Sequence, residues 1–102
     1  MSVVIIDKDN FENEIMNSEK TVLLDFWANR CAYCRMISPV IDEIAKEHPE
    51  VKVAKINVDE CPEIAQDFKI KSIPSLFVLK NGEITNRLTG AKSKTRIEQM
   101  LK

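Results

Sequence analysis

The sequence predicts an α/β fold in which helices cover both faces of a mixed β-sheet. Segments with strand and helix patterns alternate in the order β-α-β-α-β-α-β-β-α, and such alternation is typical of parallel strands joined by crossover helices. Residues 21–27 are almost continuously apolar, which indicates a central strand covered on both faces. Asn81-Gly82 separates the last two strand patterns and predicts a hairpin, which adds an antiparallel pair to the sheet.

The first half of the chain predicts one further strand and two helices. Residues 3–6 are apolar and β-branched, which indicates a short strand, and Asp9 is placed to cap a helix after it. Residues 31–48 carry apolar side chains at spacings of three and four. That periodicity predicts a long amphipathic helix directly after the central strand.

The second half predicts three more strands and two short helices. Residues 51–59 alternate apolar and polar side chains, as a strand does. Residues 62–68 begin with proline, which is favoured in the first turn of a helix. The hairpin strands follow at 76–80 and 83–88. Ser93 is placed to cap a last helix, whose inward side chains are Ile97, Met100 and Leu101.

The composition is that of a globular domain, and we expect residues 1–102 to form a single one. Apolar residues make up 44% of the chain, charged residues 30%, and the net charge is -1. Because a basic face supplies most of the affinity for nucleic acid, we expect no nucleic-acid partner. No apolar run approaches the ~20 residues that span a bilayer, and the N-terminus lacks a signal-peptide pattern. We therefore expect no membrane association, a cytoplasmic location and a monomer.

The pair Cys31 and Cys34 is the strongest chemical signal in the sequence. It follows the strand at 21–27 and opens the long helix, and the carboxyl ends of parallel strands are where α/β sheets present their sites. Free N–H groups and the dipole at a helix N-terminus stabilise a thiolate, which lowers the pKa of a cysteine placed there. We expect Cys31, at the exposed end, to attack, and Cys34, one turn further on and within disulfide reach, to resolve.

Two other interpretations of the cysteine pair compete with a redox site. A zinc half-site needs two more ligands, and the spare candidates, Cys61 and His48, form no paired spacing with anything. A structural crosslink is rare in the cytosol, and a domain of this size needs none to bury a core. We therefore expect no metal and no cofactor. We interpret His48 as a helix-end residue and Cys61 as a bystander.

The motifs around and beyond the cysteines resemble the thioredoxin family over nearly the whole chain. They are L-L-D-F-W-A, C-A-Y-C-R-M-I-S-P, A-K-I-N-V-D, K-S-I-P-S-L-F-V-L-K-N-G-E and T-G-A, in that order. A C-x-x-C pair beside a βαβ pattern in a cytosolic chain is a recognised sign of a thioredoxin-like redox motif. The resemblance implies the thioredoxin fold, a central mixed sheet flanked by helices, and dithiol–disulfide exchange with disulfide-bearing protein substrates. It also implies a flavoprotein thioredoxin reductase as the electron donor.

The resemblance assigns roles to residues near the cysteine pair. Cys31 matches the family's nucleophile, Cys34 its resolving cysteine, and Asp25 a buried acid that manages protons for the resolving thiol. Burial in an apolar strand should raise the pKa of Asp25, which suits proton transfer near neutral pH. Lys55 matches a lysine near that acid. The matching substrate-facing positions are Trp27, Ile73, the cis-proline Pro74 and Gly90.

Four places depart from the family pattern. Arg30 stands where a tryptophan usually precedes the first cysteine, and Ala32-Tyr33 stands where glycine-proline usually separates the two. Lys69 replaces a glycine at a helix end, and Ser75 replaces a threonine. The positive charge of Arg30 should favour the thiolate of the neighbouring cysteine. We count Arg30, Ala32 and Tyr33 among the substrate-facing residues, where they bear on the reduction potential, the reductase and the substrates.

Two alternatives to a thioredoxin-type reductase remain open at this point. Tyr33 is similar to the tyrosine between the cysteines of glutaredoxins, which would make the chain a glutathione-linked oxidoreductase. Against this, I-P-S-L-F-V-L-K-N-G-E follows the thioredoxin pattern, and no glutathione-binding signature follows the hairpin. The altered surface at Arg30 permits a binding module with little turnover. The intact cysteine pair, Asp25 and Pro74 argue against that alternative.

Overall fold

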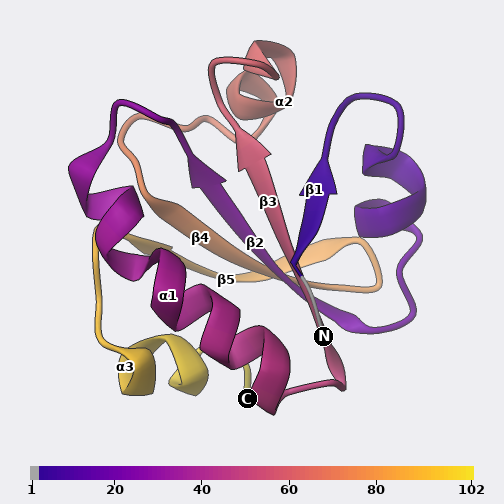
Figure 1. The fold of residues 1–102 in the computed structure, drawn as a ribbon. Coiled ribbons are helices and arrows are strands. Elements are labelled where there is room, and N and C mark those ends of the chain that lie inside the picture. The colour runs from indigo at the N-terminus through magenta and orange to yellow at the C-terminus, as the bar shows by residue number, and fades with distance from the viewer. Residues whose placement is uncertain (1–2) are drawn as a thin grey trace.

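The computed structural model describes residues 3–102 and contains a five-stranded sheet with strand order β1-β3-β2-β4-β5 (Figure 1). The strands are β1 (Val4–Ile6), β2 (Thr21–Trp27), β3 (Val51–Asn57), β4 (Ser75–Lys80) and β5 (Glu83–Thr89). β1, β3 and β2 are parallel, whereas β4 pairs antiparallel with both β2 and β5. The predicted mixed sheet, with its antiparallel pair contributed by the C-terminal hairpin, is confirmed.

Helices cover both faces of this sheet. On one face lie α1 (Ala32–Glu47) and α3 (Lys94–Gln99), and on the other η1 (Glu12–Met16) and α2 (Pro62–Asp67). Figure 1 shows α1 crossing the sheet lengthwise with α3 beside its far end. The predicted long helix is confirmed, with Cys31 and His48 as its capping residues.

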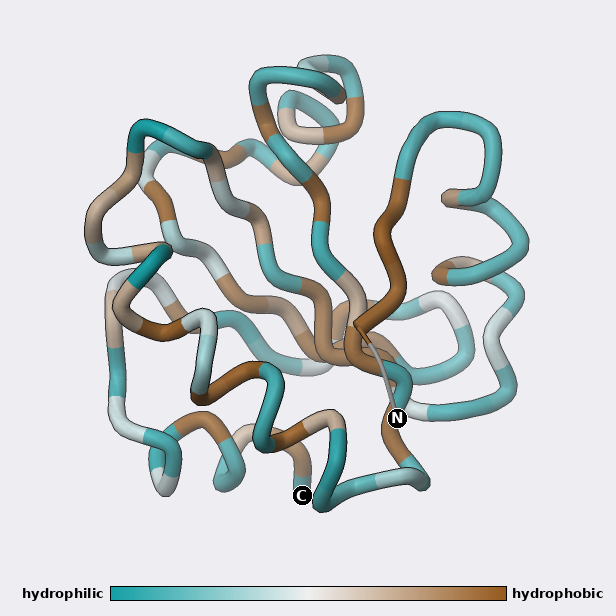
Figure 2. The backbone as a smooth tube through the Cα atoms, viewed as in Figure 1, coloured by the Kyte–Doolittle hydropathy of each residue, from teal (hydrophilic) through white to brown (hydrophobic). Residues whose placement is uncertain are grey.

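Each face of the sheet has its own apolar core. Side chains alternate between the faces of a strand, so Leu23 packs toward α1 and α3, while Val22 and Leu24 pack toward η1 and α2. In Figure 2 brown, apolar segments gather where the strands meet in the middle of the molecule, and the loops at the edges are mostly teal. Strand β2 is therefore buried on both sides, as its continuous apolar run predicted.

The first helix differs from its prediction. It is a five-residue π-helix, η1, and Asp9 does not cap it. The Asp7 carboxylate accepts hydrogen bonds from the backbone N–H groups of Asp9 and Asn10, at 2.8 and 3.0 Å. An aspartate two residues before an N–H group closes such a turn locally. Asp7 therefore closes the turn before η1, and η1 itself has no side-chain cap.

The turns and ends of the second half follow the sequence closely. Asn81 and Gly82 both have positive φ, 54° and 80°, as a two-residue hairpin turn requires. Ser93 caps α3 by accepting a hydrogen bond from the backbone N–H of Arg96. Strand β3 ends at Asn57, two residues before its predicted end, because the Asn57 side chain accepts from the N–H groups of Asp59 and Glu60 and turns the chain.

Lys69 holds a left-handed backbone conformation just after α2. Its φ is 57°, and its N–H and that of Ile70 donate to the carbonyls of Gln66 and Ala65. This is the Schellman pattern that ends many helices, and glycine is the usual residue at the position of Lys69. A lysine at this position therefore carries a backbone cost.

No helix within residues 3–102 has the length and apolar character needed to cross a membrane.

Candidate active site

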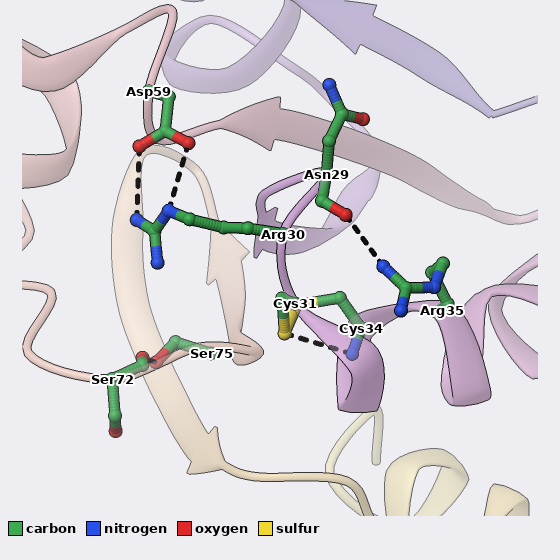
Figure 3. The surroundings of a disulfide bond; sticks show 8 residues. All are labelled: Asn29, Arg30, Cys31, Cys34, Arg35, Asp59, Ser72 and Ser75. Atoms are coloured by element: carbon green, nitrogen blue, oxygen red, sulfur yellow. Dashed lines mark hydrogen bonds and ion pairs between the residues drawn. A yellow bond between two sulfur atoms is a disulfide. The ribbon is translucent and has the colours of Figure 1, made fainter.

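The cysteine pair forms a disulfide at the N-terminus of α1. Cys31 is the N-cap residue, Cys34 lies in the first turn, and their Cα atoms are 5.3 Å apart. The backbone N–H of Cys34 donates to the Cys31 sulfur at 3.1 Å, as Figure 3 shows. The Cys31 sulfur thus caps the helix, and the same N–H would stabilise a thiolate once the disulfide is reduced.

The two sulfur atoms differ in access. Cys31 is half-buried, whereas Cys34 is only 4% exposed. The first turn of α1 contains no acidic side chain, so nothing in it opposes a negative charge on Cys31. Cys31 is therefore the sulfur more accessible to a molecule arriving from solvent.

Asp25 lies inside β2 with its carboxyl group almost fully buried, at 1% exposure. It shares the face of Leu23, which is the face that α1 covers. Burial raises the pKa of Asp25 to about 7, and the charge of Lys55 opposes that rise. Within residues 3–102, its Oδ1 atom has no hydrogen-bond partner. A buried carboxyl that gains and loses a proton near neutral pH can serve as a general acid and base.

Lys55 is the cross-strand neighbour of Asp25, since β2 and β3 pair these two residues in register. Its ammonium group donates to the Ser38 hydroxyl of α1 at 3.4 Å and lies 4.8 Å from the centre of the Trp27 ring. Lys55 thus acts on Asp25 by its charge and makes no direct ion pair with it among the described residues. Because Ser38 follows Cys34 by one helical turn, the contact between Lys55 and Ser38 places Lys55 beneath the start of α1.

The loop before β4 has the cis peptide that the sequence suggested, between Ile73 and Pro74. The N–H of Gly90 donates to the Pro74 carbonyl at 2.8 Å, and Gly90 itself has a φ of 93°, which favours glycine. The Ser75 hydroxyl donates to the Ser72 carbonyl and tightens the same loop. Within residues 3–102, no hydrogen bond uses the backbone N–H or C=O of Ile73.

The exposed residues beside the disulfide include Arg30, Ala32 and Tyr33. Tyr33 is 62% exposed, and Ala32 is exposed with it. The Arg30 guanidinium donates two hydrogen bonds to the Asp59 carboxylate, at 3.1 and 3.2 Å, as Figure 3 shows. Its charge is therefore shared with Asp59, which weakens the effect on Cys31 that the sequence alone suggested.

Sequence reasoning missed Asp59 and Ser38 as neighbours of the site. Asp59 closes the motif A-K-I-N-V-D, but nothing in the local pattern says that Arg30 reaches it. Ser38 stands at a polar position of an amphipathic helix and gave no chemical signal. Both contacts join segments that are far apart in the chain, so only the folded structure reveals them.

His48 and Cys61 lie outside this arrangement. The His48 ring bridges Glu50 and Glu98 at 3.1 and 2.9 Å, which ties the end of α1 to α3. The Cys61 thiol is buried against the Ile6 carbonyl, and burial raises its pKa, so it is a weak nucleophile. The interpretation of His48 as a helix-end residue is confirmed by its place as the C-cap of α1.

Comparison with known proteins gives a consistent result over the length of the chain. The family model described as Thioredoxin matches residues 2–102. A thioredoxin of Porphyra purpurea is 44% identical over 102 residues, which are 99% of this chain and 95% of that protein. Thioredoxin 1 of a Nostoc species is 41% identical over 97 residues, covering 94% of this chain and 91% of the relative. The chloroplastic thioredoxin M5 of Oryza sativa is 43% identical over 100 residues, covering 97% of this chain and 58% of that longer protein.

Proposed function

Since this chain belongs to the thioredoxin family and is a thiol–disulfide oxidoreductase with a C-x-x-C dithiol pair, we propose that it acts as a reductant of protein disulfides. The observation that carries this proposal is the Cys31–Cys34 disulfide at the start of α1, with Cys31 the more accessible of the two. The disulfide is the oxidised form, from which a reductase regenerates the dithiol.

The proposed cycle has two exchange steps. The Cys31 thiolate attacks one sulfur of a substrate disulfide, forms a mixed disulfide and displaces the other substrate sulfur as a thiolate. The Cys34 thiolate then attacks the Cys31 sulfur, which breaks the mixed disulfide, releases the second substrate thiolate and restores the bond seen here. Two electrons pass to the substrate in each cycle, and the protein becomes oxidised.

Asp25 supports the second step in this proposal. Cys34 must lose its proton before it attacks, and Asp25 lies on the sheet face beneath α1, with its pKa raised to about 7 by burial. A carboxylate formed at that pKa is a base of suitable strength for this transfer. Lys55 adjusts the charge of Asp25 from the neighbouring strand.

The substrate chain is proposed to dock across the loop before β4. Ile73 offers a free N–H and C=O for backbone pairing, and Pro74 and Gly90 hold that loop in place. The rim of this surface consists of Trp27, Arg30, Ala32 and Tyr33. Because Arg30 and Tyr33 are charged or polar where the family is apolar, we expect them to alter which substrates and which reductase this C-A-Y-C site prefers.

The electron donor is proposed to be a flavoprotein thioredoxin reductase. The protein is proposed to work in the cytoplasm, with residues 1–102 acting as one domain. The family supports a reductase partner in general terms, and the Tyr33 position is the reason to test glutathione beside it. Oxidised protein would be mixed with either donor, and the appearance of free thiols followed. Rapid reduction by the reductase and slow reduction by glutathione would support the proposal, and the reverse order would contradict it.

Replacement of one cysteine at a time tests the cycle itself. With Cys34→Ser, the mixed disulfide with a protein substrate should accumulate, because the resolving thiolate is absent. The adduct would be detected as a mass increase that a reducing agent removes. Cys31→Ser serves as the matched control and should form no adduct. Equal adduct formation by the two variants would contradict the assignment of the attacking residue.

A further inference from the structure

A cationic hollow lies on the sheet face opposite α1, beside the loop that leads to Pro74. It has a volume of about 320 Å³ and lies between the segment at 68–72 and the strands β4 and β5. Register pairs Phe77 with Arg87 and Ser75 with Thr89, so these four side chains share one face. Because Phe77 belongs to the core on the α2 side, this face of the sheet is the one opposite α1.

The charge of the hollow is uniformly positive. Its lining includes Lys69, Lys71 and Arg87, together with the exposed hydroxyl groups of Ser72 and Thr89, and contains no acidic residue. Within the described part of the chain, none of the three cations forms an ion pair. The net charge of the whole chain is -1, so this local excess is not a general property of the surface.

One of these cations, Arg87, is held in place by the fold. Its guanidinium lies 5.2 Å from the centre of the Phe77 ring, where cation–π attraction and packing orient it. For Lys69 the backbone is fixed by two hydrogen bonds at the end of α2, while its side chain is exposed. Arg87 is therefore preorganised, which reduces the entropy lost when an anion binds.

The hollow is connected to the reactive site through the segment at 70–72. Ile70, Lys71 and Ser72 line this hollow on one side and, on the other, a second hollow of about 230 Å³ that contains Arg30 and Ile73. Figure 3 shows Arg30 and Ser72 on the same side of the disulfide. A chain paired with the free backbone groups of Ile73 would therefore lead past Ser72 toward the cations.

We propose that this hollow, lined by Lys69, Lys71 and Arg87, binds a run of carboxylate side chains that flanks the disulfide of a protein substrate. The proposal rests on the proposed reductase function and adds a substrate class to it. Charge complementarity identifies the occupant, since three unpaired cations in one concave surface favour a segment carrying several negative charges. The contact is made outside the exchanging sulfurs, so it acts on substrate binding and encounter.

Two synthetic peptides test the proposal. Both carry the same disulfide, one followed by a run of Glu and the other by the same run of Gln. At low ionic strength the wild-type protein should reduce the Glu peptide with a kcat/KM about tenfold higher, mostly through a lower KM. The preference should largely vanish near 1 M salt, where screening acts over about 3 Å.

Two variants locate the effect. The triple variant K69Q/K71Q/R87Q should lose most of the Glu/Gln preference, and K69Q/K71Q, which keeps the contact of Arg87 with Phe77, should lose part of it. The matched control K8Q/K46Q/K102Q removes the same charge from exposed lysines outside the hollow and should keep the preference. Circular dichroism and thermal unfolding establish that each variant is folded.

The outcomes separate the two proposals. No Glu preference in the wild type, or an equal loss in the control variant, would overturn the docking inference while leaving disulfide reduction intact. Failure of the wild type to reduce either peptide would overturn the proposed function. If inorganic phosphate binds the wild type and not the triple variant, yet the Glu run has no effect, the hollow takes a free anion and the proposal is wrong.

Discussion

Asp25 is the residue whose chemistry differs most from that of a free side chain. Its carboxyl group is buried in an apolar strand, and desolvation raises its pKa from the usual value of 3.8 to about 7. Only the charge of Lys55 opposes that rise. At neutral pH the group is thus divided between its two protonation states, which is the property that the proposed proton transfer to and from Cys34 needs.

The variant Asp25→Asn should be more stable than wild type at pH 8, and this gain over wild type should be much smaller at pH 5. Because the folded-state pKa is raised, the folded protein binds a proton that the unfolded chain has lost between pH 4 and 7, so wild-type stability falls as pH rises through that window. Well above pH 7 the buried charge costs roughly 4 kcal/mol, which the neutral amide avoids.

Urea unfolding of both oxidised proteins at several pH values measures this difference. A stability gain that is independent of pH would contradict the buried titration of Asp25. The same variant should also prolong the mixed disulfide with a substrate, since it removes the base proposed for Cys34.

Among the elements, α2 ends on an unfavourable residue. Lys69 has a φ of 57°, a region in which an L-residue with a side chain is strained by about 1–2 kcal/mol and glycine is not. Lys69→Gly should therefore stabilise the fold by about 0.5–1 kcal/mol, after allowance for the greater freedom of glycine in the unfolded chain.

Chemical denaturation compares this variant with Lys46→Gly, the matched control. Lys46 lies in the last turn of α1, where glycine should destabilise by up to about 1 kcal/mol. Destabilisation by both substitutions to a similar extent would show that the left-handed residue is not strained.

Helices α1 and α3 are joined by charged side chains as well as by their shared core. His48 bridges Glu98 and Glu50, and Lys94 pairs with Glu43 and Glu47. The hydrogen bonds to Glu98 and Glu50 raise the pKa of His48. A raised folded-state pKa means that this contribution to stability is complete below the unfolded pKa and is lost as pH rises through the folded pKa.

His48→Gln should therefore reduce stability more at pH 6 than at pH 9, by less than about 1 kcal/mol since the bridge is partly exposed. Thermal unfolding at the two pH values provides the comparison. Glu98→Gln should reproduce the loss at pH 6, and a larger loss at pH 9 for either variant would contradict the proposed protonated bridge.

At the scale of the whole molecule, the sequence predicted the order of elements and the position of the cysteine pair. Three local signals each predicted one structure correctly. The continuous apolar run predicted the buried strand β2, Asn81-Gly82 predicted the hairpin turn, and Ser93 predicted the start of α3. The site residues were predicted from the family motifs, and the structure brings Asp25 and Lys55 into register.

The remainder depends on contacts between distant segments, which local patterns do not encode. The pairing of Arg30 with Asp59 and the contact of Lys55 with Ser38 each join residues far apart in the chain. At the turn before η1, it is Asp7 and not Asp9 that accepts from the backbone, and the local sequence does not distinguish these two aspartates. The cationic hollow unites the end of α2 with β5, and no sequence motif links those two segments.

The central claim is that the whole protein works as a reductant, with electrons leaving through Cys31. The equilibrium reduction potential of the Cys31–Cys34 pair, measured in defined thiol buffers, tests this most directly. We predict a value at or below the cytosolic glutathione poise, about −220 to −260 mV by extraction methods. Strongly oxidising dithiol proteins have a potential of about −120 mV. A value in that region would contradict the account, because the disulfide form would then oxidise its partners.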